Sequence, residues 1–217
     1  MILFSALEHG DCLAAYHWHR GFSAANSSLF PRSLERYEDL VMQGSVWAAT
    51  DTSGNYLAQA YAAYDEGTKE CEIGGLMVAE NARGKGLGAT IMRLALVHAL
   101  VEEDILSIEG TRVVAHVLKG NNDPRGIIES KLRFAYARSV EIPQGVLPGL
   151  KADEDGFIRG DEYEIQLPET ITGLAEWAEN WHDHVNGGSD AIIELRAGVS
   201  MPLWANALRE IESRYAK

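Results

Sequence analysis

The stretch Leu76-Met77-Val78-Ala79-Glu80-Asn81-Ala82-Arg83-Gly84-Lys85-Gly86-Leu87-Gly88 carries most of the information about the fold. Three of its glycines stand at alternate positions, and a helical apolar pattern begins directly after them, over 89–101. Glycine lets backbone N–H groups approach an anion closely, and the N-terminus of a helix carries a partial positive charge. Arg83 and Lys85 add basic side chains. The stretch therefore predicts a strand, an anion-binding turn and a helix.

Two other phosphate-binding motifs compete for the same glycines. Residues 84–89 also satisfy a dinucleotide fingerprint, G-x-G-x-x-A, but that motif expects an acidic residue at the end of the next strand. The next predicted strand ends in Leu118 and Lys119, without an acid, so this interpretation is disfavoured. A nucleotide-hydrolase loop needs glycine at position 79 and Ser or Thr after the lysine. Ala79 and Gly86 stand there, which excludes that class.

Upstream of the loop, apolar runs alternate with turn residues, and downstream of it strands alternate with helices. This order predicts an α/β fold of the α+β kind, with a mixed, mainly antiparallel sheet flanked by helices. The segment 141–156 is rich in Pro and Gly, and we expect a long loop there. The expected elements are a strand at 2–7, a helix capped by Asp11, a helix after Pro31, strands at 45–50, 56–64 and 69–78, a helix at 89–101, a strand at 111–118, a helix at 124–132, and strands at 134–140 and 157–167.

Residues 168–217 are expected to form a helical C-terminal extension that packs on a domain at 1–167. Three of the five tryptophans lie in this extension. The segment Ala191–Leu195 is ambiguous between strand and helix. Three roles stay open for the extension: closing a substrate pocket, forming a homodimer interface, or completing the core. Two amphipathic stripes carry the prediction, Leu174, Trp177, Ala178, Trp181 and Val185, and then Leu203, Trp204, Ala207, Leu208 and Ile211.

The chain carries a net charge of −13, from 19 basic and 32 acidic residues. Nucleic-acid binding needs a basic face, so we expect no nucleic acid partner. An acidic protein suits a cationic substrate such as an amine, although acidity also serves solubility alone. No apolar run is long enough to span a membrane, and the first residues carry no basic leader, so we expect a cytoplasmic protein without a membrane partner.

The sequence offers no convincing metal site. Cys12 and Cys71 fit no metal-ligand spacing and indicate a reducing compartment. The histidines cluster in His17-Trp18-His19 and His182-Asp183-His184, but side chains two positions apart on a helix diverge. His19 is a candidate for lining a substrate pocket near the first two helices, and its alternative is a surface histidine or one satisfied in the core.

The motif and the element order together resemble the GNAT superfamily of acyl-CoA N-acyltransferases over about residues 1–167. The resemblance implies acetyl-CoA or another acyl-CoA as cosubstrate, and direct acyl transfer to an amine of a small molecule or protein in a ternary complex, without a metal. It also implies that the backbone of Leu76, Met77 and Val78 pairs with the pantetheine arm. The implied pyrophosphate and pantetheine contacts are Arg83, Gly84, Lys85, Gly86, Leu87, Gly88, Ala89 and Asn122, the last of which has helix capping as its alternative.

For proton transfer, the resemblance points to Glu72, whose position matches the catalytic glutamate of the histone-acetylating branch. Its alternative role is an ion pair between strands, and Glu70 on the same face is a weaker substitute. Glu129 stands where many members carry a tyrosine acid, so Glu129 and Tyr136 are secondary catalytic candidates. Arg133 stands where the family usually has glycine, so we expect the turn there to differ.

Two other functions remain open beside the transferase. One is a catalytically silent acyl-CoA sensor or scaffold on the same fold, which the replacement of tyrosine by Glu129 favours. The other is a toxin or effector that acylates proteins or aminoacyl-tRNA, although the acidic charge disfavours tRNA.

Overall fold

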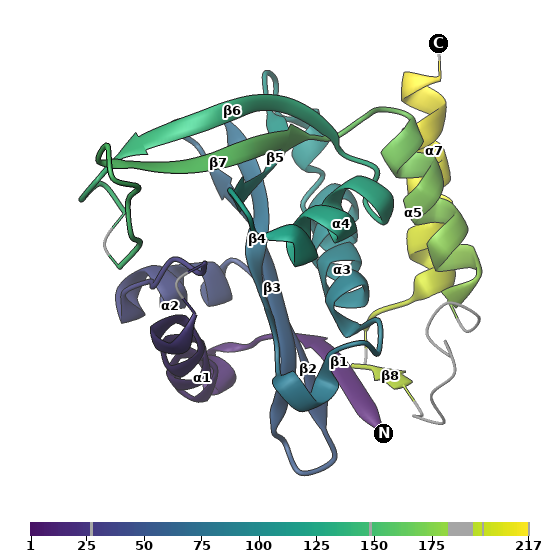
Figure 1. The fold of residues 1–217 in the computed structure, drawn as a ribbon. Helices are drawn as coiled ribbons and strands as arrows, with labels where there is room; N and C mark the ends of the chain where they lie inside the picture. Colours follow the sequence, from purple (N-terminus) through teal and green to yellow (C-terminus); the bar gives the residue numbers. More distant parts are fainter. Residues whose placement is uncertain (27, 148, 182–192, 197, 217) are drawn as a thin grey trace.

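A mixed sheet forms the centre of the computed structural model, which describes residues 1–26, 28–147, 149–181, 193–196 and 198–216. In this part of the chain eight strands lie in the order β6-β7-β5-β4-β3-β2-β1-β8 (Figure 1). Of the paired neighbours, β4 with β5 and β1 with β8 run parallel, and the others are antiparallel, which confirms the predicted fold class. The strands are β1 Ile2–Ala6, β2 Val46–Asp51, β3 Tyr56–Asp65, β4 Glu70–Val78, β5 Arg112–Leu118, β6 Ala135–Pro143, β7 Phe157–Glu164 and β8 Ile193–Leu195.

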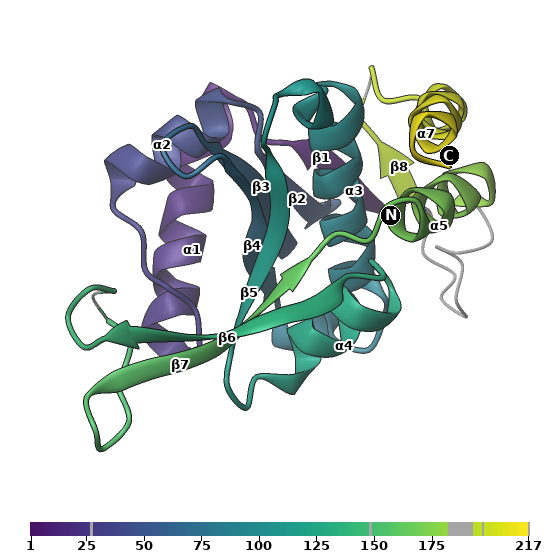
Figure 2. The same ribbon diagram turned by 90° about the horizontal axis from the view of Figure 1, so that it is seen from above.

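Helices cover both faces of this sheet. Figure 2 shows α1 and α2 on one face and α3 and α4 on the other, with α5 and α7 side by side beyond α3. The buried apolar residues accordingly form a smaller cluster under α1 and α2 and a larger one around α3, α5 and α7. The helices are α1 Cys12–Ala25, α2 Leu34–Met42, α3 Leu87–Val101, α4 Asn122–Ser130, α5 Glu169–Glu179 and α7 Met201–Tyr215, with short 3-10 turns at His9–Asp11, Glu80–Ala82 and Ile105–Ser107.

Several element boundaries differ from the sequence prediction by one to three residues. Helix α3 begins at Leu87, two residues before the predicted start, because Gly86 takes the N-cap position. Strand β6 continues to Pro143, past the expected residue 140, and strand β7 ends at Glu164, before the expected residue 167. Local propensity leaves such ends open by a few residues, and hydrogen bonding decides them. Asp11 stands at the N-cap of α1 as predicted, but its carboxylate accepts the N–H of Glu8 at 3.1 Å and so closes the preceding 3-10 turn.

The extension contributes to the larger core. Trp204 on α7 packs edge-on against Trp47 of β2, with ring centroids 5.7 Å apart, and its indole N–H donates to Glu102 at 2.6 Å. Trp181 packs edge-on against Phe4 of β1 at 6.3 Å. The ambiguous segment is a strand over Ile193–Leu195, paired parallel to β1. Val185, Ala191 and the His182–His184 cluster lie outside the described residues. Of the three proposed roles, completing the core is the one that these contacts support.

Candidate active site

The glycine loop adopts a backbone that two of its glycines make possible. Gly84 and Gly86 have φ angles of 73° and 77°, in the left-handed region that other residues seldom enter. A Cβ added at either would meet no atom within 4 Å, so the space beside the loop is open. Gly88 differs, because its Cβ would lie 3.2 Å from Ile127 and 3.3 Å from Val78. The third glycine therefore lets α3 approach β4 and α4.

A cavity of about 580 Å³ lies in front of this loop, and we call it the coenzyme cavity. The backbone N–H groups of Leu87, Gly88 and Ala89 belong to the first turn of α3 and have no acceptor within the helix, so they suit a pyrophosphate. A coenzyme A moiety fits this lining, which combines an anion site with an apolar wall. Eight of the residues predicted for the coenzyme line the cavity: Leu76, Val78, Arg83, Gly84, Gly86, Leu87, Gly88 and Ala89.

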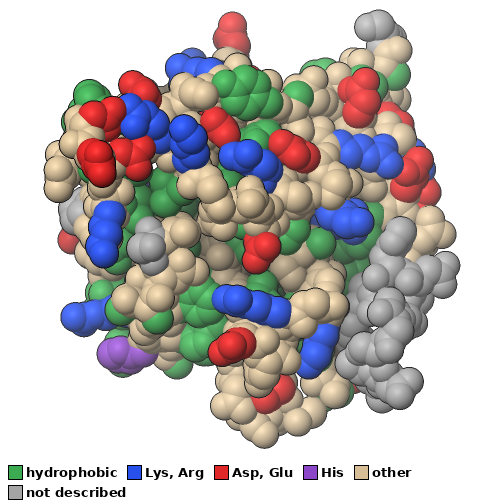
Figure 3. All heavy atoms as spheres, viewed as in Figure 1, with side chains coloured by type: hydrophobic (Ala, Val, Ile, Leu, Met, Phe, Trp, Pro, Cys, Tyr) green, Lys and Arg blue, Asp and Glu red, His purple; other side chains and the backbone are tan. Residues whose placement is uncertain are grey.

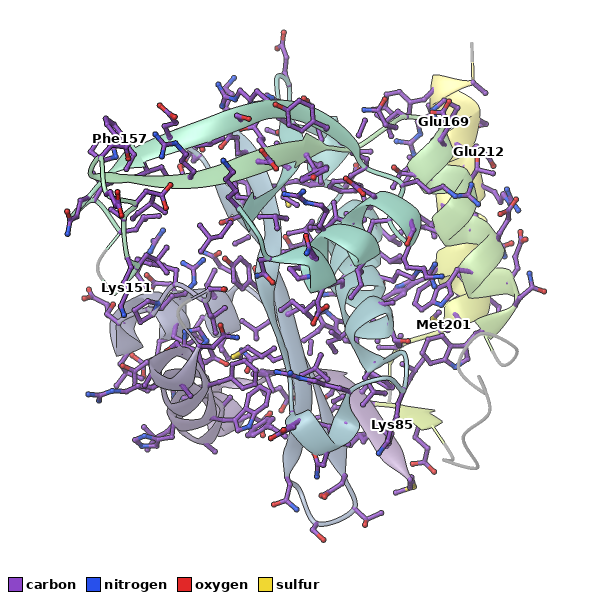
Figure 4. All side chains as sticks on the ribbon, in the orientation of Figure 1. Lys85, Lys151, Phe157, Glu169, Met201 and Glu212 are labelled. Atoms are coloured by element: carbon purple, nitrogen blue, oxygen red, sulfur yellow. The ribbon has the colours of Figure 1, made fainter. Side chains whose placement is uncertain are left out.

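Three other predicted coenzyme contacts do not line the coenzyme cavity. Met77 is buried on the opposite face of β4, as the alternation of a strand requires. Lys85 lies in the loop before α3, and its ammonium donates to the backbone oxygen of Asn81 at 2.8 Å (Figure 4). Asn122 is the exposed first residue of α4, and its neighbour Asn121 occupies the N-cap position and lines the cavity.

Strands β4 and β5 separate beside the coenzyme cavity. They pair only over Glu70–Glu72 with Arg112–Val114, and the rest of each strand diverges. Strand β4 also has a bulge near this point, which is seen as a shift in its register with β3 between Gln59 and Tyr61. A bulge of this kind bends the strand that carries it. Gly75 makes this bend at a φ of 62°, where a Cβ would lie 2.3 Å from the Tyr61 ring. The opening gives an extended ligand access to unpaired β4 backbone.

A connecting cavity of about 80 Å³ continues through this opening. It shares Leu76, Asn121 and Pro124 with the coenzyme cavity, and His116 of β5 also lines it. Together with Glu72, His116 lines two further cavities. His116 therefore belongs to the walls of three of these four cavities.

His116 lies between two carboxylates. Its Nδ1 is 3.6 Å from Oε1 of Glu72, and its Nε2 is 3.2 Å from Oε2 of Glu162. The Glu162 side chain is 0% exposed, and it also binds Arg112 at 2.5 Å and Arg138 at 2.8 Å. These contacts fix the imidazole in one orientation.

The same contacts shift the proton affinities of the three groups. The Glu72 carboxylate raises the pKa of His116, with a further contribution from Glu162, against the opposing effect of burial. Burial raises the pKa of Glu72, but His116, Arg32 and Tyr61 outweigh it and hold that pKa below its usual value. Burial likewise opposes the ionisation of Glu162, yet Arg138, Arg112 and His116 lower its pKa to about 2. The arrangement is two carboxylates around an imidazole that titrates above its ordinary pKa.

Arg32 and Tyr61 complete the surroundings of Glu72. The Arg32 guanidinium lies 4.5 Å from the centroid of the Tyr61 ring, bonds to its hydroxyl and stands 3.9 Å from Glu72. The Tyr61 hydroxyl donates to Glu72 at 3.4 Å. His19 is buried, and its Nε2 accepts the backbone N–H of Arg32 at 3.4 Å. Burial, and then the charge of Arg32, lowers the pKa of His19 to about 4, so this histidine is a neutral support.

A family model for the acetyltransferase (GNAT) family matches residues 13–124, which is more than half of the 217 residues. The chain belongs to this family. The matched region contains the glycine loop, Glu72 and His116. No curated protein matches the chain.

Solved structures of GNAT acetyltransferases share the fold at low sequence identity. The ribosomal-protein-S18-alanine N-acetyltransferase of Escherichia coli has a TM-score of 0.54 at 18% identity, over 76% of this chain and 93% of that one. An N-acetyltransferase of Staphylococcus aureus Mu50 has a TM-score of 0.55 at 15% identity, over 77% and 99%. A mutant spermidine N-acetyltransferase of Vibrio cholerae has a TM-score of 0.53 at 15% identity, over 78% and 96%.

At positions 129 and 133 this chain was expected to depart from the usual GNAT sequence pattern, and the structure shows both residues. Arg133 has a φ of 58°, so the left-handed turn is kept although the residue is not glycine, and the predicted change in the turn is wrong. Its guanidinium lies against Gly173 of α5, where a Cβ would be 2.9 Å away. Glu129 is exposed, and Tyr136 is 56% exposed with its hydroxyl 3.1 Å from Ser139. Neither lines the four cavities described for this site, so their catalytic roles stay predictions.

Sequence reasoning missed His116 and Glu162. His116 is the one titratable residue inside the apolar run Val113–Leu118, and a polar residue in such a run was the available signal. Glu70, the weaker alternative base, is bound to Arg112 at 2.8 Å. Within the described ranges, no group of three metal-ligating side chains is found, and no helix has the length and apolar character to cross a bilayer.

Proposed function

We propose that this GNAT protein is an N-acetyltransferase that moves an acetyl group from acetyl-CoA to a primary amine by direct attack. The observation that carries the proposal is the series of neighbouring cavities that share lining residues, from the glycine loop through the connecting cavity to His116 and Glu72. A coenzyme bound by its pyrophosphate at residues 83–89 extends its thioester toward these two side chains. The fold relatives that are acetyltransferases support the same activity.

An acceptor that arrives as an ammonium ion loses two protons: one before the attack, which frees the nitrogen lone pair, and one from the nitrogen as the amide forms. As the nitrogen bonds to the acetyl carbonyl carbon, the carbon–sulfur bond breaks and the coenzyme leaves as a thiolate. We assign both proton transfers to the pair formed by His116 and Glu72, which passes the first proton to solvent and the second to solvent or to the thiolate. A base is most effective when its pKa lies near the working pH, which favours the imidazole as the atom that takes the proton. Glu72 keeps the imidazole basic and attracts the cationic acceptor.

The sign of the pH dependence follows from this assignment. Protonated His116 cannot accept the amine proton, so kcat/KM should fall below a pKa that lies above the ordinary 6.5. Glu72→Gln removes the carboxylate that raises this pKa, so the acidic limb should move to lower pH while turnover falls. His116→Asn should lose about 100-fold or more in kcat/KM and lose the limb itself.

Thiol release from acetyl-CoA over a panel of amines tests the proposal. Glu38→Gln, an exposed carboxylate on α2, is the matched control and should behave as wild type. Tight acetyl-CoA binding without thiol release on any amine would instead favour the silent sensor or scaffold. An unchanged pH profile in Glu72→Gln would remove this residue from the mechanism.

A further inference from the structure

Two cavities of different chemistry meet at the Glu72–His116 pair. One, the polar cavity, has a volume of about 240 Å³ and lies toward α2. The other, the apolar cavity, has a volume of about 270 Å³ and lies under the β6–β7 hairpin. Both include Glu72 and His116 in their walls. An acceptor nitrogen at this pair can therefore extend the rest of its molecule into either space.

The apolar cavity offers little to a polar group. Its surface comes mainly from six aliphatic side chains, Val117, Leu118, Val140, Ile142, Leu147 and Ile158. The two other charged residues in its wall are already engaged, because Asp161 binds Arg125 at 2.6 Å and Arg159 binds Glu141 and Asp153 at 2.9 and 2.8 Å. Figure 3 shows acidic and basic side chains side by side where the free end of the β6–β7 hairpin lies in Figure 1. A second ammonium group would find no unpaired carboxylate among the described residues of this wall.

The polar cavity has the opposite character. Four carboxylates, from Asp39, Asp65, Glu70 and Glu72, share its wall with the guanidinium groups of Arg32 and Arg36. Asp39 is paired with Arg36, Glu70 with Arg112, and Glu72 with Arg32 and His116. Among the described residues Asp65 has no ion-pair partner, so its carboxylate is the group here that can attract an ammonium ion.

The loop between β6 and β7 borders the apolar cavity on one side. Leu147 of this loop lines the cavity, and Gly149 approaches the segment before α2 so closely that a Cβ would lie 2.6 Å from Pro31. An engineered apolar cavity of about 150 Å³ holds benzene, so the space here suffices for a phenyl or branched alkyl group. The part of such a group that contacts these side chains is removed from water.

We infer that the acceptor is a primary amine that carries a compact apolar substituent, an aryl or branched alkyl group, on a short linker. The amine nitrogen meets the thioester at His116 and Glu72, and the substituent fills the apolar cavity. This inference rests on the proposed acetyltransferase function. The same chemistry occurs in a free amine and in the N-terminal residue of a peptide, and the experiment separates the two sources.

The test compares matched amines with the full chain and acetyl-CoA. Phenethylamine and isopentylamine represent apolar acceptors, and ethanolamine and putrescine are their polar counterparts. Burial of the apolar group should raise kcat/KM about 10- to 100-fold over ethanolamine. A tripeptide with N-terminal leucine and a free α-amine tests the peptide source, because only a peptide site would favour it over isopentylamine.

Two variants test whether the apolar cavity causes the preference for apolar amines. Leu147→Gln should lower the ratio of kcat/KM for phenethylamine to that for ethanolamine about tenfold, and the nearly isosteric Val140→Thr should lower it less. Val146→Gln is the control in the same loop, because Val146 is 61% exposed and does not line the cavity, so its ratio should equal that of wild type.

Binding separates this inference from the function on which it rests. Calorimetry of phenethylamine with the protein–CoA complex reports the pocket even when no acetylation occurs. Binding that Leu147→Gln weakens, without turnover, would refute the transferase and keep the acceptor site. Preferred acetylation of putrescine, or equal ratios in Leu147→Gln and wild type, would overturn the apolar acceptor and keep the transferase.

Discussion

Gly86→Val is the change that should separate coenzyme binding from folding. Gly86 has a φ of 77°, and an added Cβ meets nothing within 4 Å, so the folded protein has room for the side chain. The left-handed conformation costs about 1–2 kcal/mol for a residue with a Cβ. In a chain of this size that cost lowers Tm by roughly 2–8 °C.

The effect on the coenzyme should be larger. The valine side chain occupies the open space in which we place the pyrophosphate, and it disturbs the N–H groups at the start of α3. A hydrogen bond to a charged group contributes about 1.5–3 kcal/mol, so the loss of one or two amounts to about 3 kcal/mol. The Kd for acetyl-CoA should therefore rise about 100-fold.

Gly54→Val is the matched control for this variant. Gly54 lies in the turn between β2 and β3 with a φ of 79°, and its Cβ would also meet no atom within 4 Å. The backbone strain is thus the same, but the site is remote from the cavities. Calorimetric titration with acetyl-CoA, and thermal unfolding of both variants, should show equal losses of Tm and a loss of affinity in Gly86→Val alone. Wild-type affinity in Gly86→Val would refute the pyrophosphate assignment.

Three further changes test other parts of the site and core. Glu162→Gln should lower the pKa of His116 and shift the acidic limb of kcat/KM to lower pH, with acetyl-CoA affinity unchanged. The folded-state pKa of Glu162 is about 2 against the ordinary 4.5, so unfolding curves should show wild type losing more stability than the variant as pH falls between these values. Gly75→Ala should displace Tyr61, lower kcat and reduce the free energy of unfolding by about 1–3 kcal/mol. Wild-type kcat and stability in this variant would show that the bend in β4 does not matter for the site. Trp204→Ala should cost about 3–5 kcal/mol in denaturant unfolding, and a value near zero would show that α7 is not part of the core.

The glycine loop was predictable because its requirements are local. Positive φ angles at Gly84 and Gly86 and the start of a helix follow from residues that are adjacent in the sequence. The order of the elements along the chain was predictable for the same reason, since most turns carry a Gly, Asp or Asn signal. Glu72 was proposed from the family resemblance and from its place on the strand that leads to the loop, and its catalytic role stays a prediction.

The partners of Glu72 were beyond such reasoning because they depend on pairing between distant strands. Glu162 reaches His116 only because β7 pairs with β5 in the register that sets these two residues opposite each other. The place of Arg133 could not be predicted either, because the guanidinium of Arg133 lies in space that Gly173 on the distant helix α5 leaves free. These contacts join segments far apart in the chain, and no local pattern encodes them.

Single-turnover reaction with labelled acetyl-CoA and phenethylamine tests the central claim most directly. The protein and its coenzyme are mixed in equal amounts, and the label is followed by mass spectrometry in the amine, in the protein and in free acetate. Direct transfer at the Glu72–His116 pair predicts label in N-acetylphenethylamine, none on the protein, and a rate that falls sharply in His116→Asn. Label that stays on acetyl-CoA, accumulates on the protein or appears only as acetate would contradict the account.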